Sequence, residues 1–204
     1  MLLSRCQGLE RRSGETTNFI VSVRRWAMAA LFLFAALNLA AAQSATEYQV
    51  KAAFLFNFAK FVEWPADAFP TSDAPLQICV FGQDPFGGDF EQVIGDKKVN
   101  GHRLEIIHPS GVPQARSCQI LFVTSSQKPQ TREILQGIKG TSVLSVGDTP
   151  GFARAGGIIN FVLDENRVRF EINPKAAERA HLKLSARLLT VAKLIVTEEE
   201  SPGK

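Results

Sequence analysis

The run LQICVFG, residues 76–82, decides the fold class, because it is short, almost wholly apolar and closed by a glycine. Such a run is typical of a strand buried on both faces of a sheet. Two later runs have the same character, CQILFVTSS (118–126) and TSVLSVGD (141–148). The intervening segments 85–95 and 131–140 have helical patterns. This alternation of strand and helix predicts a parallel sheet that helices cover on both faces.

Two further segments predict antiparallel pairing. The stretch GIINFVLDENRVRFEIN (157–173) holds two apolar runs around a turn at 164–166, and its second run alternates apolar with charged residues. That alternation is typical of a hairpin at the edge of a sheet, with one face packed against the core and the other exposed to solvent or engaged in a contact. The segment KVNGHRLEIIHP (98–109) predicts one or two strands with a turn at Asn100-Gly101.

Long helices are predicted at both ends of the domain. The first runs from Thr46 to Trp64 and ends before Pro65, which disfavours helical backbone in the preceding residue. The last begins with Asn173 as N-cap and Pro174 in the first helical position. Its predicted buried stripe consists of Ala177, Leu184, Leu188, Val191 and Ile195. The predicted fold is an α/β three-layer sandwich, with a mostly parallel sheet, an antiparallel hairpin at one edge and long N- and C-terminal helices.

The first 42 residues are typical of a signal peptide. An uncharged apolar run follows the pair Arg24-Arg25, and Ala40-Ala41-Ala42 predicts cleavage before Gln43. The alternative is an uncleaved N-terminal anchor. A start at Val21 or Val23 would give a leader of ordinary length and leave residues 1–20 untranslated. The prediction is export, one domain over residues 46–196, and a disordered polar tail over 197–204.

Removal of the leader changes the charge of the protein. The leader holds five of the 23 basic and two of the 20 acidic residues, which leaves 18 of each. The mature chain therefore lacks the basic surplus of a nucleic-acid-binding protein. We also expect no membrane insertion of the mature chain.

Two cysteines remain after cleavage, Cys79 in the first buried strand and Cys118 at the start of the second. In an oxidising compartment they can form a disulfide, provided that the two strands are neighbours in a suitable register. The alternative is a pair of buried thiols that pack as small apolar side chains.

The sequence predicts neither an enzyme nor a cofactor. Its three histidines, His102, His108 and His181, have no metal-type spacing, and no nucleophile or phosphate-loop motif is present. His181 falls on the apolar stripe of the last helix, which favours a packed histidine.

Small polar side chains follow the three parallel strands. They are Gln83-Asp84, Thr124-Ser125-Ser126 and Asp148-Thr149. Ligands bind beyond the carboxyl ends of the strands in open parallel sheets, so Gln83, Asp84, Ser125, Ser126 and Asp148 are candidates for a small-molecule crevice. The alternative is ordinary turn and helix-cap chemistry.

The first helix, EYQVKAAFLFNFAKFVEWP (47–65), is amphipathic, with two aromatic residues outside its apolar arc. Phe56 and Trp64 fall on the polar side, beside Lys60 and Glu63. Exposed aromatics among polar residues are common at contact surfaces, so these four residues are predicted to contact a partner or a second copy. The alternative is that another element, or the loop 65–75, covers the two rings.

The chain resembles the YfiR-like family over about residues 46–196. The resemblance rests on the first helix, on ICVFGQDPFG and CQILFV, and above all on GGIINFVLDENRVRFEINPKAAERAHLKLSARLL. It implies a small exported periplasmic protein with an α/β sandwich fold that can dimerise. It also implies a non-enzymatic repressor of an inner-membrane diguanylate cyclase of YfiN type, which would lower cyclic di-GMP and biofilm formation. The alternative function is a periplasmic sensor that binds a small molecule in the strand-end crevice.

The resemblance also bears on single residues. Cys79 and Cys118 match a cysteine pair that forms a redox-responsive disulfide in the family. A second family pair has no counterpart, because no cysteine follows Cys118. His181 stands where many relatives have glycine.

Overall fold

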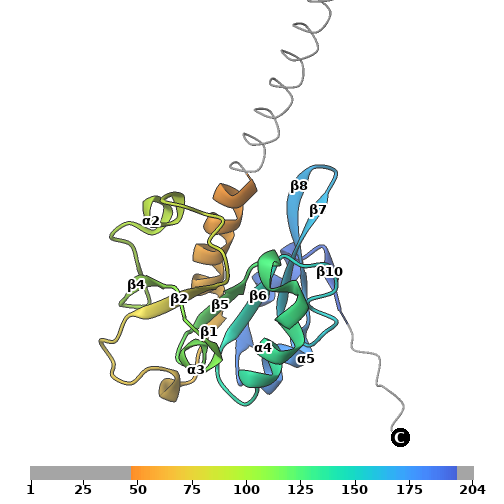
Figure 1. The fold of residues 1–204 in the computed structure, drawn as a ribbon. Helices are drawn as coiled ribbons and strands as arrows, with labels where there is room; N and C mark the ends of the chain where they lie inside the picture. Colours follow the sequence, from red (N-terminus) through yellow and green to blue (C-terminus); the bar gives the residue numbers. More distant parts are fainter. Residues whose placement is uncertain (1–46, 197–204) are drawn as a thin grey trace, which may run out of the picture. The chain divides into compact units, whose positions relative to one another are not determined.

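The computed structural model describes residues 47–196 of the chain (Figure 1). The predicted signal peptide, its cleavage site and the tail at 197–204 lie outside the described residues. No helix within residues 47–196 is long and apolar enough to cross a membrane.

The fold is built on an eight-stranded sheet in the order β10-β8-β7-β6-β5-β2-β4-β3. Most neighbouring pairs are parallel, whereas β3–β4 and β7–β8 are antiparallel. This confirms the predicted α/β class with a mostly parallel sheet. The strands are β2 (Leu76–Phe81), β3 (Lys98–Val99), β4 (His102–Ile107), β5 (Ile120–Val123), β6 (Leu144–Gly147), β7 (Ile159–Asp164), β8 (Arg167–Ile172) and β10 (Leu194–Ile195).

Helices pack on both faces of this sheet. Alternate residues of β5 enter two separate apolar clusters, Ile120 and Phe122 in one and Leu121 and Val123 in the other. The first cluster also takes side chains from the helix 47–61, from α5 (Pro174–Arg179) and from α6 (Ala186–Val191). The second takes side chains from α3 (Val112–Ala115) and α4 (Thr131–Gly137). The remaining helices are η1 (Ala66–Ala68), α2 (Asp89–Ile94) and η2 (Ser125–Gln130).

The predicted hairpin is formed by β7 and β8. Its turn residues, Glu165 and Asn166, both have positive φ angles (47° and 61°), as a two-residue hairpin turn with the correct twist requires. The hairpin lies next to the sheet edge, because the two-residue strand β10 pairs with the outer side of β8. β6 ends opposite Asn160, so the rest of the hairpin projects beyond its neighbour (Figure 1).

The predicted long C-terminal helix is wrong, because α5 ends after Arg179. His181 adopts a left-handed φ of 56°, its N–H donates to Glu178 O, and the N–H of Leu182 donates to Ala177 O. These two bonds form a Schellman motif, which stops a helix and turns the chain away. The predicted stripe is accordingly interrupted, and His181 is exposed instead of packed.

The predicted N-terminal helix is also too long at its carboxyl end. It ends at Phe61, and β1 (Val62–Glu63) then pairs antiparallel with β9 (Lys183–Leu184). Tertiary pairing with the distant segment β9 therefore ends the helix before the proline does.

Cys79 and Cys118 form a disulfide in the structure. β2 and β5 are parallel neighbours, and the two Cα atoms lie 6.0 Å apart, within the range that a disulfide needs. Both side chains are buried in the second apolar cluster. The bond therefore ties two central strands together inside the core.

Candidate functional site

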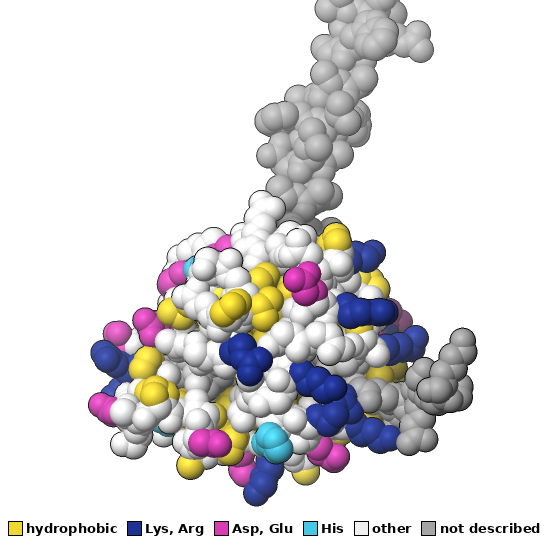
Figure 2. Space-filling model, turned by 60° about the horizontal axis from the view of Figure 1, so that its bottom comes forward, with side chains coloured by type: hydrophobic (Ala, Val, Ile, Leu, Met, Phe, Trp, Pro, Cys, Tyr) yellow, Lys and Arg dark blue, Asp and Glu magenta, His cyan; other side chains and the backbone are white. Residues whose placement is uncertain are grey.

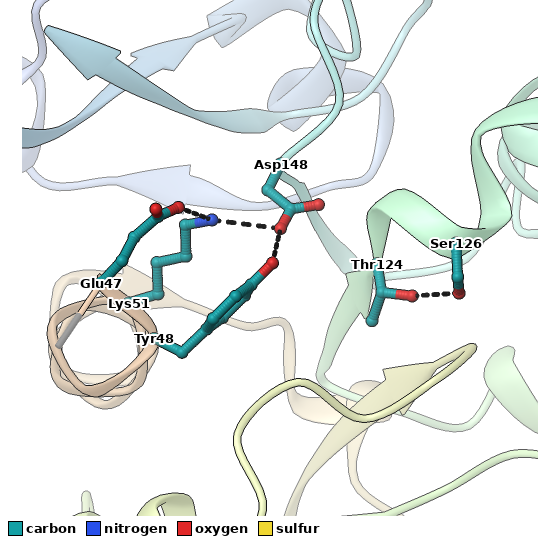
Figure 3. Close-up of polar contacts among 6 residues, drawn as sticks. All are labelled: Glu47, Tyr48, Lys51, Thr124, Ser126 and Asp148. Carbon is teal, nitrogen blue, oxygen red and sulfur yellow. Dashed lines mark hydrogen bonds and ion pairs between the residues drawn. The ribbon is translucent and has the colours of Figure 1, made fainter. Parts of the chain in front are cut away.

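The loops after β2 and β5 are held together at the carboxyl end of the sheet. The N–H of Gln83 donates to Ser126 Oγ (3.0 Å), and the hydroxyls of Ser126 and Thr124 lie 2.7 Å apart (Figure 3). Gly82 allows this approach, since a Cβ there would lie 2.5 Å from Thr124 Oγ1, and its φ of +108° suits glycine alone.

A charged cluster joins the end of β6 to the start of the helix 47–61. Asp148 Oδ2 accepts hydrogen bonds from Tyr48 OH (3.0 Å) and Lys51 Nζ (3.1 Å), and Lys51 Nζ also lies 2.6 Å from Glu47 Oε1 (Figure 3). The side chains of Lys51 and Asp148 are only 5% and 3% exposed. Because a buried charge is tolerated only when it is paired, the two residues depend on each other.

Tyr48 is a hydrogen-bond donor in this cluster. Burial, followed by the charge and the hydrogen bond of Asp148, raises the pKa of the Tyr48 phenol above its ordinary value of 10.0. A hydrogen bond from Ser125 acts in the opposite direction. The phenol therefore stays protonated at neutral pH and supplies neither a base nor a nucleophile.

Two oxygen atoms at the end of β6 are buried without a hydrogen-bond partner among the described residues. They are Asp148 Oδ1 and Thr149 Oγ1. Next to them the amide of Asn160, which is fully buried, faces the carbonyls of Gly147 (3.2 Å) and Thr149 (3.0 Å), and these two acceptors assign the amide nitrogen to that side. Buried oxygens of this kind normally bind a water molecule or a ligand donor.

The structure brings together four of the five predicted crevice residues, in two groups. Gln83 bonds to Ser126, whereas Asp148 and Ser125 both interact with Tyr48. Asp84 is engaged elsewhere, because Oδ1 accepts from the N–H of Phe86 (2.8 Å) and Oδ2 contacts His108 Nε2 (3.1 Å). The first of these contacts is the turn chemistry that was the alternative prediction.

Four residues of the site were not predicted from the sequence, namely Glu47, Tyr48, Lys51 and Asn160. Lys51 carried a signal, because it precedes Leu55 and Phe58 by four and seven residues and so lies on the apolar face of its helix. A lysine on an apolar face requires a buried partner, here Asp148. Asn160 carried a similar signal as the lone amide within the apolar run GIINFVL.

The predicted exposure of Phe56 is wrong. Its side chain is 8% exposed and packs in the first apolar cluster, with Lys60 Nζ 4.1 Å and Lys97 Nζ 4.9 Å from the ring centroid. Trp64 is half-buried and donates through Nε1 to Gln119 O (3.2 Å). Lys97, which is distant in sequence, therefore helps to cover the Phe56 ring, as the alternative held, whereas Trp64 stays partly exposed. Lys60 and Glu63 are exposed, and a role for these four residues in partner or dimer contact remains a prediction.

The C-terminal third of the domain is rich in exposed basic side chains. Residues 167–193 contain seven Lys or Arg, all exposed, and only two Glu. Figure 2 shows Lys and Arg side chains gathered on one side of the face that it presents. Large apolar side chains are also exposed at the end of this segment and just after it, namely Val191, Leu194 and Ile195. Exposed apolar side chains and complementary charge are both common at surfaces that contact a partner.

Among residues 47–196, no group of three or more His, Cys, Asp or Glu side chains could hold a metal ion. The bonds of Tyr48 and Lys51 to Asp148 hold the start of the helix 47–61 against the sheet.

Comparison with known proteins gives one extended match. A family model described as YfiR/HmsC-like matches residues 48–193, nearly all of the described chain. No protein with a curated description matches. Two similar solved structures are an ABC domain in complex with L-Trp from Streptococcus pneumonia and a conserved domain protein from Vibrio cholerae O1 biovar El Tor. Each shows 10% identity over 59% of this chain, with a TM-score of 0.45, and the chain spans 55% of each protein.

Proposed function

Because the chain belongs to the YfiR/HmsC-like family, we propose that it is an exported regulatory protein that represses an inner-membrane diguanylate cyclase of YfiN type. It binds the periplasmic sensor part of the cyclase and so lowers cyclic di-GMP and biofilm formation. The family match over residues 48–193 is the observation that carries this proposal. The chain acts by binding and not by catalysis.

The disulfide and the leader support the proposed compartment. A Cys79–Cys118 bond is stable in an oxidising environment such as the periplasm, and residues 1–42 have the pattern of a cleavable export signal. The seven exposed Lys and Arg side chains of residues 167–193 support binding to a partner with an acidic face.

Deletion of the gene tests the proposal. Cyclic di-GMP should rise in the deletion strain and return to its original level when the full chain is supplied. A version that lacks residues 1–42 is the matched control, because it is not exported and should not restore repression. Unchanged cyclic di-GMP in the deletion strain, together with no membrane signalling protein in a pull-down, would contradict the proposal.

A second candidate function is that of a small-molecule sensor at the strand ends. The unpartnered oxygens Asp148 Oδ1 and Thr149 Oγ1 favour it, because a polar ligand could supply the donors that they lack. A thermal-shift screen of small polar metabolites tests it, with Asp148→Asn as the control. A screen in which no compound raises the Tm of the wild type would argue against this function.

A further inference from the structure

A cavity of about 480 Å³ is formed by β7, the start of the helix 47–61 and the loop that follows β6. Its volume falls within the range of about 300–1,000 Å³ that is typical of small-molecule sites. Part of its lining is apolar, namely Pro150, Phe161, Val162 and Leu163. Leu163 is 58% exposed, so this apolar wall is open to a ligand. The cavity can therefore hold a small molecule that has a hydrocarbon body.

The buried amide of Asn160, which lines this cavity, faces acceptors on both of its sides. Gly147 O and Thr149 O lie 3.2 and 3.0 Å from one side, and Glu171 Oε2 lies 3.3 Å from the other. Because the nitrogen can turn to only one side, the amide oxygen meets an acceptor in either orientation. With the nitrogen directed to the two carbonyls, the amide oxygen and Glu171 Oε2 face each other. Oxygens that meet in this way need a donor from a water molecule or a ligand.

The charged residues of the lining leave a negative balance. Lys51 Nζ contacts both Glu47 Oε1 (2.6 Å) and Asp148 Oδ2 (3.1 Å), so two carboxylates share one ammonium group. The lining also holds Glu171 and Arg154, of which Arg154 is exposed. Three carboxylates therefore accompany two cations, and Asp148 Oδ1 has no hydrogen-bond partner among the described residues. Both the charge and the surplus of acceptors favour a cation that carries N–H donors.

We propose that the cavity binds a small aliphatic amine in its protonated form, with the ammonium group between Glu171 Oε2 and the amide oxygen of Asn160. The ammonium group supplies three donors and a positive charge, and the hydrocarbon chain lies along the apolar wall. A carboxylate in the same place is disfavoured, because it would add a further acceptor. The inference rests on the second candidate function, the small-molecule sensor, whose ligand class it names. It does not depend on repression of the cyclase.

Titration calorimetry on the protein purified under oxidising conditions tests the inference with two probes of equal length, 1,4-diaminobutane and succinate. The diamine should bind and raise the Tm, whereas succinate should do neither. Glu171→Gln keeps the shape of the side chain but removes its charge and supplies an N–H of its own. The dissociation constant of this variant for the diamine should therefore increase at least about tenfold.

Two further variants serve as controls. Glu178→Gln removes an exposed carboxylate of α5 that does not line the cavity, so the dissociation constant for the diamine should change less than about twofold. Arg154→Gln removes a positive charge from the lining. Because that charge repels a cationic ligand, the dissociation constant of this variant should decrease.

The Tm of the ligand-free protein gives an independent readout. Glu171→Gln should raise it, because the new amide can donate to the Asn160 oxygen that previously faced an acceptor. A Tm at or below that of the wild type would show that this oxygen already has a donor, and the inference would be wrong. It is also wrong if Glu171→Gln binds the diamine as tightly as the wild type. If the diamine does not bind while another compound of the metabolite screen does, the ligand class is wrong and the sensor function stands. If no compound binds, both are wrong.

Discussion

Loss of the Cys79–Cys118 bond is expected to lower the free energy of unfolding by about 4 kcal/mol. The bond joins residues separated by 39 positions. The chain-entropy relation for a loop of this length gives about 13 cal/mol/K, or about 3.9 kcal/mol at 25 °C. For a domain of roughly 150 residues, that free energy corresponds to a decrease of about 12 °C in Tm.

Urea unfolding of three samples measures this effect. The samples are the oxidised wild type, the wild type with a reducing agent, and the double variant Cys79→Ala/Cys118→Ala. The reduced protein keeps both buried sulfur atoms, so its difference from the double variant isolates the packing of the two side chains from the loop constraint. The reasoning is refuted if reduction changes the free energy of unfolding by less than about 1 kcal/mol. It is equally refuted if the protein purified under oxidising conditions, once unfolded, titrates with two free thiols.

Four further substitutions test the contacts of the candidate site, the burial of Phe56 and the end of helix α5. Lys51→Met should destabilise the domain by about 3–5 kcal/mol, because it leaves the buried Asp148 carboxylate without its counter-charge; adding Asp148→Asn should recover part of the loss in the same urea assay. Phe56→Ala should destabilise the domain by about 3 kcal/mol, as expected for a buried ring. His181→Gly should stabilise it by about 1 kcal/mol, because glycine adopts the left-handed φ without strain. Tyr48 has a raised pKa in the folded state, so the unfolded chain loses this proton first as pH rises, and stability should fall above about pH 10; in Tyr48→Phe this fall should be smaller.

Distinct results would contradict each of these four expectations. Equal stability of Lys51→Met and wild type would mean that the cluster at Asp148 is not a buried ion pair. Weaker partner binding by Phe56→Ala at unchanged Tm would restore the view of Phe56 as a surface contact. A lower Tm for His181→Gly would argue against a left-handed helix end at this residue. Identical stability profiles above pH 10 for wild type and Tyr48→Phe would remove the phenol as the titrating group.

The fold class could be predicted from the sequence because the patterns that indicate it are local. Continuous apolar runs predict strands buried on both faces, and the structure places the three quoted runs side by side as β2, β5 and β6. The hairpin turn at residues 164–166 was equally accessible, since its short polar stretch separates two runs of strand-forming residues.

The candidate site could be predicted only in part from the sequence, because its contacts join residues that are distant in the chain. Asp148 follows a predicted strand and could be placed at the sheet edge, but its partners Tyr48 and Lys51 lie about a hundred residues away in the chain. Helix periodicity marks Lys51 as inward-facing without saying which carboxylate it meets. Phe56 was misplaced for the same reason, because Lys97 covers its ring from another element.

The sequence by itself determined most of the strands and helices that follow one another along the chain. It also determined the export signal pattern and the two cysteines that are available to pair. Only the tertiary structure decided where the terminal helices stop and which side chains of the first helix are covered by other segments. It also decided that β7 extends beyond the end of β6. These features depend on which strands become neighbours and in what register. Register is a property of pairing between distant segments, whereas periodicity is a property of one segment alone. That is why the sequence predicts the elements of this protein, and tertiary packing determines their ends and their partners.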